Sequence, residues 1–274
     1  MAAVTRDGRL ATDVFSVPTG VRFGPDDLQR SLRELVEQAR SALDARAVAA
    51  LGFGTAGVVG DGPLTQCENL PLLNGANVAE LVRASAGFPV ALENDARCFT
   101  LAEARFGAAR GAHDVCGITL GTGVGCGVMI GGRLHRGTVS QAGEVWRIPV
   151  RGQNLEHFVS GAGVVRGYLA AGGSEIGLDA AGVLEKARLG DGAALRAWHA
   201  FGEDLAFLCE LVIALLDPAL IVMGGSLSRA SDVYQPILAA RLGERSTRIA
   251  ETELGQAAGV IGAAALNMDE PARR

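Results

Sequence analysis

The sequence predicts an α/β protein with two lobes. Apolar runs of strand length alternate with amphipathic helical stripes along the whole chain, and neither a low-complexity linker nor a short-period repeat interrupts them. At 274 residues the chain is long enough for one large or two small domains. Small residues at 107–111 favour a hinge, so we expect an N-terminal lobe at 1–107 and a C-terminal lobe at 108–274.

Composition and charge exclude several classes of protein. With 49% hydrophobic and 20% charged residues, the chain has the composition of a folded globular protein. A formal net charge of −5 and the lack of a Lys/Arg cluster argue against a nucleic-acid partner. No run reaches about 18 apolar residues, and the first residues lack the pattern of a signal peptide. We therefore expect no membrane span and a cytoplasmic location.

The cysteines support the same location. Their number is odd, they are scattered, and no pair has CxxC spacing. We therefore predict reduced, mostly buried thiols, with neither a disulfide framework nor a thiolate zinc site. The five residues are Cys67, Cys98, Cys116, Cys126 and Cys209.

The first part of the chain predicts a hairpin, followed by alternating helices and strands. An apolar stub at 2–4, the turn Asp7–Gly8 and a run at 10–17 have the pattern of a hairpin. Pro25 and two aspartates start a helix, because carboxylates suit the positive end of the helix dipole, and its apolar stripe extends to Leu43. Further elements are expected as strands at 47–53 and 89–92 and helices at 78–86 and 96–106.

The second part continues the alternation. Glycine-rich segments follow two of its strands, at 121–125 and 224–226, and Gly131–Gly132 makes a tight turn. The strands are expected at 115–120, 126–130, 219–223 and near 247–254, and the helices at 160–169, 180–189, 193–216, about 233–242 and 257–266.

The turn Gly121–Gly127 is the strongest candidate for an anion site. Alternate glycines let the backbone approach a ligand closely and aim N–H groups at it, while Thr122 adds a hydroxyl. The spacing does not fit a Walker loop, and no helix follows, as one would in a dinucleotide fingerprint. The residues alone leave two interpretations open, a phosphate-binding hairpin and a tight β-turn with close packing.

Two further features carry carboxylates. Asn94 and Asp95 end a strand, where a carboxylate beside an amide can orient a hydroxyl group and take its proton. Either residue could equally cap the helix that follows. Glu144 and Glu156 stand twelve residues apart on predicted loops. Such a pair can bind vicinal sugar hydroxyls, although exposed glutamates are common.

Taken together and in this order, six segments resemble the ROK family of repressors and sugar kinases, part of the actin-like ATPase superfamily. The resemblance runs nearly end to end and implies a two-lobed actin-like ATPase (ribonuclease H-like) fold, α/β in class, with an incomplete first lobe. The segments are 51–57 for G-x-G-x-P-G, with Ala56 at the usual proline, 69–71 for N-L-P, 90–96 for V-x-x-E-N-D-A, 121–127 for G-T-G-x-G-x-G, 137–144 for G-x-x-x-x-A-G-E, and 217–225 for D-P-x-x-I-V-x-G-G.

The resemblance implies an ATP-dependent kinase that phosphorylates a hexose or an N-acetylhexosamine. Asp95 would accept the proton of the sugar hydroxyl as it attacks the γ-phosphate, and Mg²⁺ would bridge the phosphate oxygens. A homodimer is among the states that the resemblance allows. The sugar-binding residues would be Gly57, Asn94, Glu144, Arg147 and Glu156. The nucleotide would lie against Gly121, Thr122, Gly123, Gly125, Gly224 and Gly225.

The chain departs from the family pattern in two places. Family kinases begin with a strand and a D-x-G-G-T phosphate loop, whereas Met1 falls about where the family's second strand is under way. After Glu144 the family has a histidine and a cysteine-rich zinc loop; here Arg147 replaces the histidine and the cysteines are absent, so we expect no structural zinc. His157 is nearby, but one histidine does not make a zinc site. Arg147 could pair with Glu144 or Glu156, meet a charged substrate, or be a solvated surface residue.

These departures leave two alternatives to an active kinase. One is a catalytically silent sugar-binding or regulatory protein, although the helix-turn-helix of the family's repressors is not found in this sequence. The other is a kinase whose true start lies upstream of Met1. The motifs do not identify the sugar or the hydroxyl that is phosphorylated.

Overall fold

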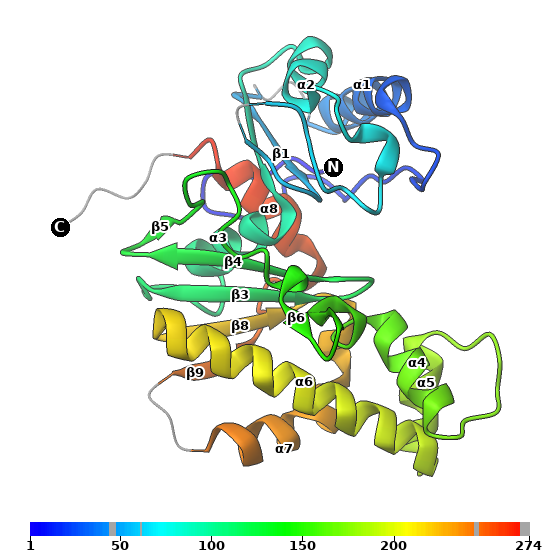
Figure 1. The fold of residues 1–274 in the computed structure, drawn as a ribbon. Helices are drawn as coiled ribbons and strands as arrows, with labels where there is room; N and C mark the ends of the chain where they lie inside the picture. Colours follow the sequence, from blue (N-terminus) through cyan, green and yellow to red (C-terminus); the bar gives the residue numbers. More distant parts are fainter. Residues whose placement is uncertain (44–47, 61, 244–246, 269–274) are drawn as a thin grey trace. The chain divides into compact units, whose positions relative to one another are not determined.

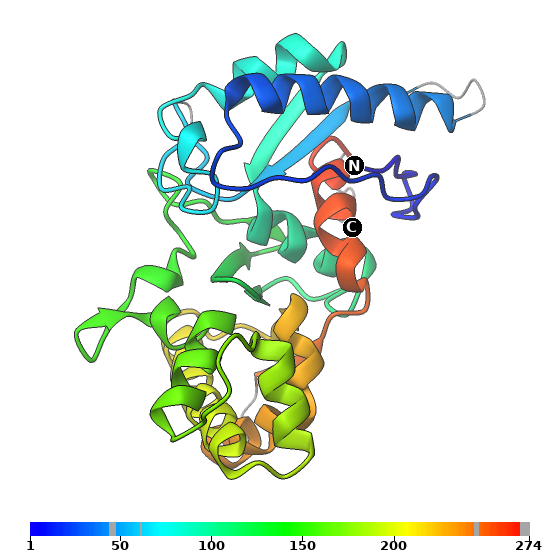
Figure 2. The same ribbon diagram turned by 90° about the vertical axis from the view of Figure 1, so that its right-hand side faces the viewer.

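The structure is a computed structural model that describes residues 1–43, 48–60, 62–243 and 247–268 (Figures 1 and 2). The chain divides into two compact units. Unit 1 comprises Met1–Gly111, Leu134–Ala142 and the chain from Glu253 onward, and unit 2 comprises Ala112–Arg133 and Gly143–Thr252. This division differs from the expected lobes at 1–107 and 108–274, because two later segments belong to unit 1.

Unit 1 is built around two parallel strands, β1 (Leu51–Thr55) and β2 (Val90–Asn94). Thr55 pairs with Asn94, so the two strands end side by side. Apolar side chains of the first two helices pack with both strands in one core, and Figure 2 shows α1, in blue, lying across the strands. The helices of unit 1 are α1 (Pro25–Ser41), α2 (Val78–Ala86), α3 (Asp95–Phe106) and α8 (Ala258–Ala265), with 3₁₀ turns η1 (Pro71–Leu73) and η5 (Gly255–Ala257).

Helix α8 belongs to unit 1 because it packs against β1 and α3 at very short range. A Cβ at Gly52 would lie 1.7 Å from the Ala263 carbonyl oxygen, and a Cβ at Gly262 would lie 1.7 Å from the Cys98 carbonyl oxygen. Only glycine allows such an approach of two backbones. Arg105 of α3 also donates hydrogen bonds to carbonyl groups at the end of α8 and beyond it, at 2.8 and 3.1 Å. A division of the sequence into two continuous lobes could not predict that a helix near the end of the chain packs in unit 1.

The N-terminal hairpin expected from the sequence does not form strands. A single antiparallel bridge joins Val4 to Leu10, and the Phe15 N–H donates to the Met1 carbonyl (2.8 Å). The antiparallel pairing of the expected hairpin is therefore confirmed, with further hydrogen bonds from the Thr5 N–H to the Arg9 carbonyl (2.9 Å) and from the Ala11 N–H to the Ala3 carbonyl (2.8 Å), whereas the regular strand expected at 10–17 is not formed. The physical reason is that Val14 is half exposed, so the second run has no buried face that would support a two-stranded ribbon.

Unit 2 is built on a five-stranded mixed sheet of order β5-β4-β3-β8-β9 (Figure 1). β3 pairs antiparallel with β4 and parallel with β8, and β8 pairs parallel with β9. The strands are β3 (Val115–Leu120), β4 (Val124–Ile130), β5 (Arg133–Leu134), β8 (Leu220–Gly224) and β9 (Arg248–Glu251). β4 begins two residues earlier than expected, because Val124 already pairs with Leu120.

Helices cover this sheet and carry much of the core of unit 2. The long helix α6 packs against α7 and α4, with Trp198, Phe201 and Tyr234 in edge-on and tilted ring contacts. The helices are α4 (Gly161–Ala170), α5 (Ala180–Arg188), α6 (Gly192–Leu216) and α7 (Ser231–Leu242). The shorter elements are η2 (Val145–Arg147), β6 (Pro149–Val150), β7 (Gln153–Asn154), η3 (Leu155–His157) and η4 (Ser226–Ala230).

Most regular elements agree with the sequence. The eight helices expected from 25 to 266 are present, with ends that differ by one or two residues. The strand expected at 47–53 begins at Leu51 in the described residues, and residue 47 lies outside them. All five cysteines are buried and unpaired, as predicted. Among the described residues, no helix combines the length and apolarity that crossing a membrane requires.

Candidate functional site

The first candidate region lies in unit 1, where β2 passes directly into α3. Asn94 caps the helix: its Oδ1 accepts the N–H groups of Ala96 (3.0 Å) and Arg97 (3.2 Å). Its amide nitrogen donates to the carbonyl of Gly57 (3.1 Å), which has a φ of +89°. The capping interpretation of Asn94 is therefore correct. Two backbone donors use its carboxamide oxygen, and among the described residues its amide nitrogen has one acceptor, so the second amide hydrogen is open to a ligand.

Asp95 is the first residue of α3 and is exposed to solvent. Although solvent reaches the residue, loss of part of its hydration raises the pKa of the carboxyl group. The hydrogen bond that Oδ1 accepts from the Ala96 N–H, at 2.9 Å, opposes this change. A carboxylate that holds a proton more tightly than an ordinary aspartate is a better general base, provided that it is ionised at the working pH.

Gly57, in the turn after β1, lies beside Asn94. A Cβ at this residue would lie 2.7 Å from the Thr65 carbonyl oxygen, so the turn depends on glycine. Its carbonyl is occupied by the Asn94 amide. Three of the residues expected in a sugar site, Gly57, Asn94 and Asp95, are thus adjacent in unit 1.

A buried charge network supports this region, and the sequence reasoning missed it. Glu93 and Arg97 are each 1% exposed and form an ion pair at 3.0 Å, and Arg136 pairs with the other oxygen of Glu93 at 2.5 Å. Arg97 also donates to the carbonyls of Ser140 (2.7 Å) and Ala142 (3.0 Å). The i,i+4 spacing of Glu93 and Arg97 could have indicated the first pair. Nothing in the sequence indicated Arg136 or the two carbonyls.

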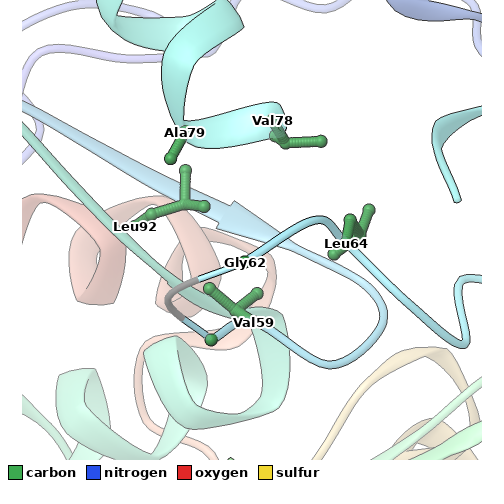
Figure 3. A pocket seen from close by; sticks show the side chains of 7 residues that line it. Val59, Gly62, Leu64, Val78, Ala79 and Leu92 are labelled. Atoms are coloured by element: carbon green, nitrogen blue, oxygen red, sulfur yellow. The ribbon is translucent and has the colours of Figure 1, made fainter. Parts of the chain in front are cut away.

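A small recess also lies in unit 1 (Figure 3). It has an empty volume of about 180 Å³, part of it open to solvent, and it is lined by small or apolar residues of α2, β2 and the loop after β1. None of the predicted site residues lines it. The lining residues are Val59, Gly60, Gly62, Leu64, Val78, Ala79 and Leu92. Because Val59, Leu64 and Val78 are members of the buried core, we interpret the recess as a packing defect beside that core.

The second candidate region lies in unit 2, at the turn between β3 and β4. The Gly121 N–H donates to the Gly123 carbonyl (2.9 Å) and closes the turn, and the Gly161 N–H donates to the Gly121 carbonyl (2.8 Å). This places the start of α4 beside the turn. Within the described ranges, the N–H groups of Thr122 and Gly123 have no hydrogen-bond partner. Two open backbone donors beside a helix N-terminus form an arrangement suited to an anion.

The end of β8 reaches the same turn. Gly224 is the last residue of β8 and pairs with Thr119, one residue before β3 ends. Gly225 has a φ of +89°, and a Cβ there would lie 2.2 Å from the Leu120 carbonyl oxygen. Gly225 therefore allows close packing just after Gly224, at the carboxyl ends of neighbouring parallel strands, where α/β sheets bind ligands.

The predicted sugar ligand Glu156 lies directly against this turn. Its Oε2 accepts the Val124 N–H at 3.0 Å, and a Cβ at Gly123 would lie 2.2 Å from the same oxygen. Gly125 follows within β4. The structure thus brings a carboxylate expected on the sugar side into contact with the turn expected on the phosphate side.

Glu144 and Arg147 lie on the segment that precedes Glu156. Glu144 accepts a hydrogen bond from the indole N–H of Trp146 (2.5 Å), and it follows Gly143, whose close approach to the Cys126 carbonyl requires glycine. Arg147 is exposed, with its guanidinium 5.7 Å from the centre of the Trp146 ring. A contact with Trp146 was not among the interpretations of Arg147 drawn from the sequence.

The described part of the chain contains no group of three or more His, Cys, Asp or Glu side chains that could hold a metal ion. His157 instead packs edge-on against Phe158, with 4.9 Å between ring centres. The segment from 144 to 158 is anchored by Arg151, which the sequence reasoning did not single out; Arg151 forms an ion pair with Asp204 of α6.

Known proteins resemble this chain over most of its length. The family model described as "ROK family" matches residues 2–270. The chain is 37% identical over 191 residues to a "Bifunctional enzyme NanE/NanK" of Brucella melitensis, covering 67% of this chain and 36% of that enzyme. It is 32% identical to an "N-acetyl-D-glucosamine kinase" of Pectobacterium atrosepticum, covering 92% of this chain and 90% of the relative.

A solved structure agrees with these sequence relatives. A ROK family glucokinase from Streptomyces griseus, in complex with glucose and AMPPNP, superposes with a TM-score of 0.82 at 26% identity and covers 97% of this chain and 94% of the glucokinase chain. The mixed α/β architecture described above is therefore that of the ROK sugar kinases. Because the family model covers nearly the whole chain and relatives above 30% identity match along most of their own length, the chain belongs to the ROK family.

Proposed function

We propose that this protein transfers the γ-phosphoryl group of ATP to a hydroxyl group of a hexose or an N-acetylhexosamine. Three observations support the proposal: family membership, relatives named as N-acetylhexosamine kinases, and a structural neighbour that is a glucokinase. The observation that carries the chemistry is Asp95, a solvent-accessible carboxyl with a raised pKa at the start of α3.

In the proposed reaction, the carboxylate of Asp95 accepts the proton of the attacking sugar hydroxyl. The hydroxyl oxygen forms the new bond to the γ-phosphorus, the bond from that phosphorus to the β–γ bridging oxygen breaks, and ADP leaves with that oxygen. Asn94 contributes one remaining amide hydrogen to the sugar. Positioning and charge neutralisation supply most of what phosphoryl transfer demands.

The remaining roles belong to the same proposal. Glu144, Glu156, Gly57 and Arg147 would contact the sugar. Thr122 and Gly123 would donate backbone N–H groups to the phosphates, Gly121 and Gly125 would shape the turn, and Gly224 and Gly225 would flank the adenosine. The open donors and the glycine packing at the ends of β3 and β8 fit a phosphate group. Mg²⁺, when bound with ATP, would neutralise charge on the phosphate oxygens.

The location and the substrate preference follow from the same considerations. The unpaired thiols and the use of ATP favour a reducing compartment, the cytoplasm. Among sugars, we favour an N-acetylhexosamine, because relatives at 31% and 32% identity are named for N-acetylgalactosamine and N-acetylglucosamine.

A direct assay tests the proposal. The protein is incubated with Mg-ATP and a panel of glucose, mannose, N-acetylglucosamine, N-acetylgalactosamine and N-acetylmannosamine, and ADP release is measured. We expect sugar-dependent ADP release, with the highest kcat/KM for one of the N-acetylated sugars. Release that does not depend on any sugar in the panel contradicts the proposed function.

The variant Asp95→Asn tests the role of the base. It keeps the size of the side chain but cannot accept the proton, so we expect kcat to fall by about 10²- to 10⁴-fold. Asp26→Asn is the matched control, because Asp26 also lies in the first turn of a helix, α1, and is exposed. Equal activity of the two variants would exclude Asp95 as the base.

A further inference from the structure

The segment between Glu144 and Glu156 contains a two-stranded hairpin that determines where both carboxylates lie. β6 and β7 are joined by the two residues Arg151 and Gly152. Beyond the hairpin, the Leu155 N–H donates to the Ile148 carbonyl at 2.8 Å, and the side chain of Leu155 is fully buried. Glu156 is the next residue. Its position therefore depends directly on how firmly the hairpin is held.

The tip of this hairpin is strained at a residue that is poorly suited to it. Arg151 has a φ of +48° and Gly152 a φ of +78°. Two positive φ angles are typical of a two-residue hairpin turn, which favours asparagine or glycine at the first position. A non-glycine residue in this conformation is strained, and it persists when its surroundings over-determine it. The contacts of the Arg151 side chain are the surroundings that maintain this conformation.

The Arg151 side chain makes two contacts with the rest of unit 2. One terminal nitrogen donates to both carboxylate oxygens of Asp204, at 2.7 and 2.8 Å, and the Asp204 side chain is 11% exposed. The guanidinium also lies over the ring of Phe158, 4.0 Å from its centre. The Arg151 side chain is itself 57% exposed, so it is held by its partners, a nearly buried carboxylate contacted through both oxygens and the aromatic ring below the guanidinium.

We propose that Arg151 is a positioning residue that fixes Glu156 for sugar binding. Phe158 follows Glu156 by two residues, and its N–H donates to the Leu155 carbonyl at 2.9 Å. The guanidinium therefore connects the tip of the hairpin to α6 on one side and to the segment just after Glu156 on the other. The Val124 N–H holds the carboxylate of Glu156 from the turn. Arg151 thus restrains the backbone on both sides of Glu156, and the Val124 N–H restrains its side chain.

This inference rests on the proposed function, in which Glu156 contacts the sugar. In this proposal Arg151 contacts neither the reacting hydroxyl group nor the phosphate. Its removal should weaken sugar binding rather than the phosphoryl-transfer step, since the base is Asp95. We expect Arg151→Ala to raise the KM for the sugar about tenfold and to change kcat much less, as loss of an ion pair and a cation–π contact implies.

Conservative variants separate positioning from general destabilisation. Arg151→Lys keeps the charge but loses the planar group that stacks on Phe158, so its KM should lie between those of the wild type and Arg151→Ala. Asp204→Asn and Phe158→Leu each remove one contact and should each raise KM by a smaller factor. Arg188→Ala is the matched control, because Arg188 forms a two-oxygen ion pair with Asp232 in the same unit, and among the described residues its hydrogen bonds go to Asp232 and to the Arg229 carbonyl, outside the 144–158 segment. Its KM should equal that of the wild type.

A second readout does not depend on activity. Hydrogen exchange at the Val124 amide, followed by NMR, reports whether Glu156 still accepts that hydrogen bond. We expect faster exchange in Arg151→Ala and an unchanged rate in Arg188→Ala. Unchanged exchange in Arg151→Ala, or a KM equal to that of Arg188→Ala, overturns the positioning role. If the wild type phosphorylates no sugar, the proposed function fails, whereas the exchange experiment still tests whether Arg151 holds Glu156.

Discussion

The start of α3 in unit 1 and the turn at Gly121–Gly123 in unit 2 are built in opposite ways. At the start of α3, side chains do the work: Asn94 caps the helix, and Glu93 and Arg97 form a buried ion pair beneath it. The turn depends on the backbone instead: glycine allows the close approach of Glu156, and the N–H groups of Thr122 and Gly123 have no hydrogen-bond partner in the part of the chain that the structure describes. The comparison shows that the start of α3 depends on particular polar and charged side chains, whereas the turn depends on the lack of side chains at its glycines.

The largest effect on stability should follow from breaking the side-chain network of unit 1. Arg97→Met removes the ion pair to Glu93 and two hydrogen bonds to carbonyl groups of 134–142, all of them buried or partly buried. We expect a loss of about 3–5 kcal/mol in the free energy of unfolding. Denaturant unfolding measures it.

Arg241→Met is the control for this network. Arg241 pairs with Glu203 and Glu210 on the surface of unit 2, with its side chain 38% exposed. Its loss should cost at most about 1 kcal/mol. A similar cost for the two variants would show that burial does not strengthen the network around Glu93.

The backbone region is tested by adding a single methyl group. Gly225→Ala introduces a Cβ 2.2 Å from the Leu120 carbonyl oxygen at a φ of +89°. We expect a loss of about 1–3 kcal/mol in stability, together with a raised KM for ATP. Gly172→Ala has the same φ but open space around the new Cβ, so it should show the strain without the change in KM. A normal KM for ATP in Gly225→Ala would contradict the nucleotide role of this glycine.

A smaller effect should separate the capping role of Asn94 from its ligand role. Asn94→Ala removes the cap of α3 and the hydrogen bond to Gly57, and we expect a loss of about 1 kcal/mol with a raised KM for the sugar. Asn77→Ala removes the cap of α2, where its side chain accepts the Glu80 N–H, and should lose similar stability with no change in KM. Equal KM values would leave Asn94 with the capping role alone.

The smallest change concerns the pH dependence of Asp95. Desolvation raises its pKa above the ordinary 3.8, and the protonated acid cannot accept a proton from the sugar. The acid limb of kcat/KM should therefore lie at a higher pH than an unperturbed aspartate would give, with activity falling as the pH drops through it. A pH–rate profile between pH 4 and 8 measures it, and an acid limb at or below about 4 contradicts the raised pKa.

The regular elements were largely predictable because their signals are local. Pro25 with two aspartates and an apolar stripe predicted α1, and apolar runs before glycines predicted β3 and β8. The N-terminal hairpin was predicted correctly as an antiparallel pairing, but its second run forms no regular strand, since the pattern of its residues could not show that this run would have no buried face. The capping of α3 by Asn94 was one of two interpretations, and only the structure showed that the same amide also holds Gly57.

The sequence by itself determined the helices, most of the strands, the glycine turns and the motifs that point to a sugar kinase, because each depends on residues close together in the chain. Tertiary structure alone decided that α8 returns to unit 1, that Arg136 joins Glu93, and that Arg151 meets both Asp204 and Phe158. Arg151 and Asp204 are 53 residues apart, and no local pattern encodes a pairing over that distance. The ion pair forms because the packing of α6 places Asp204, and the conformation of the two-residue turn places Arg151, within hydrogen-bonding distance of each other.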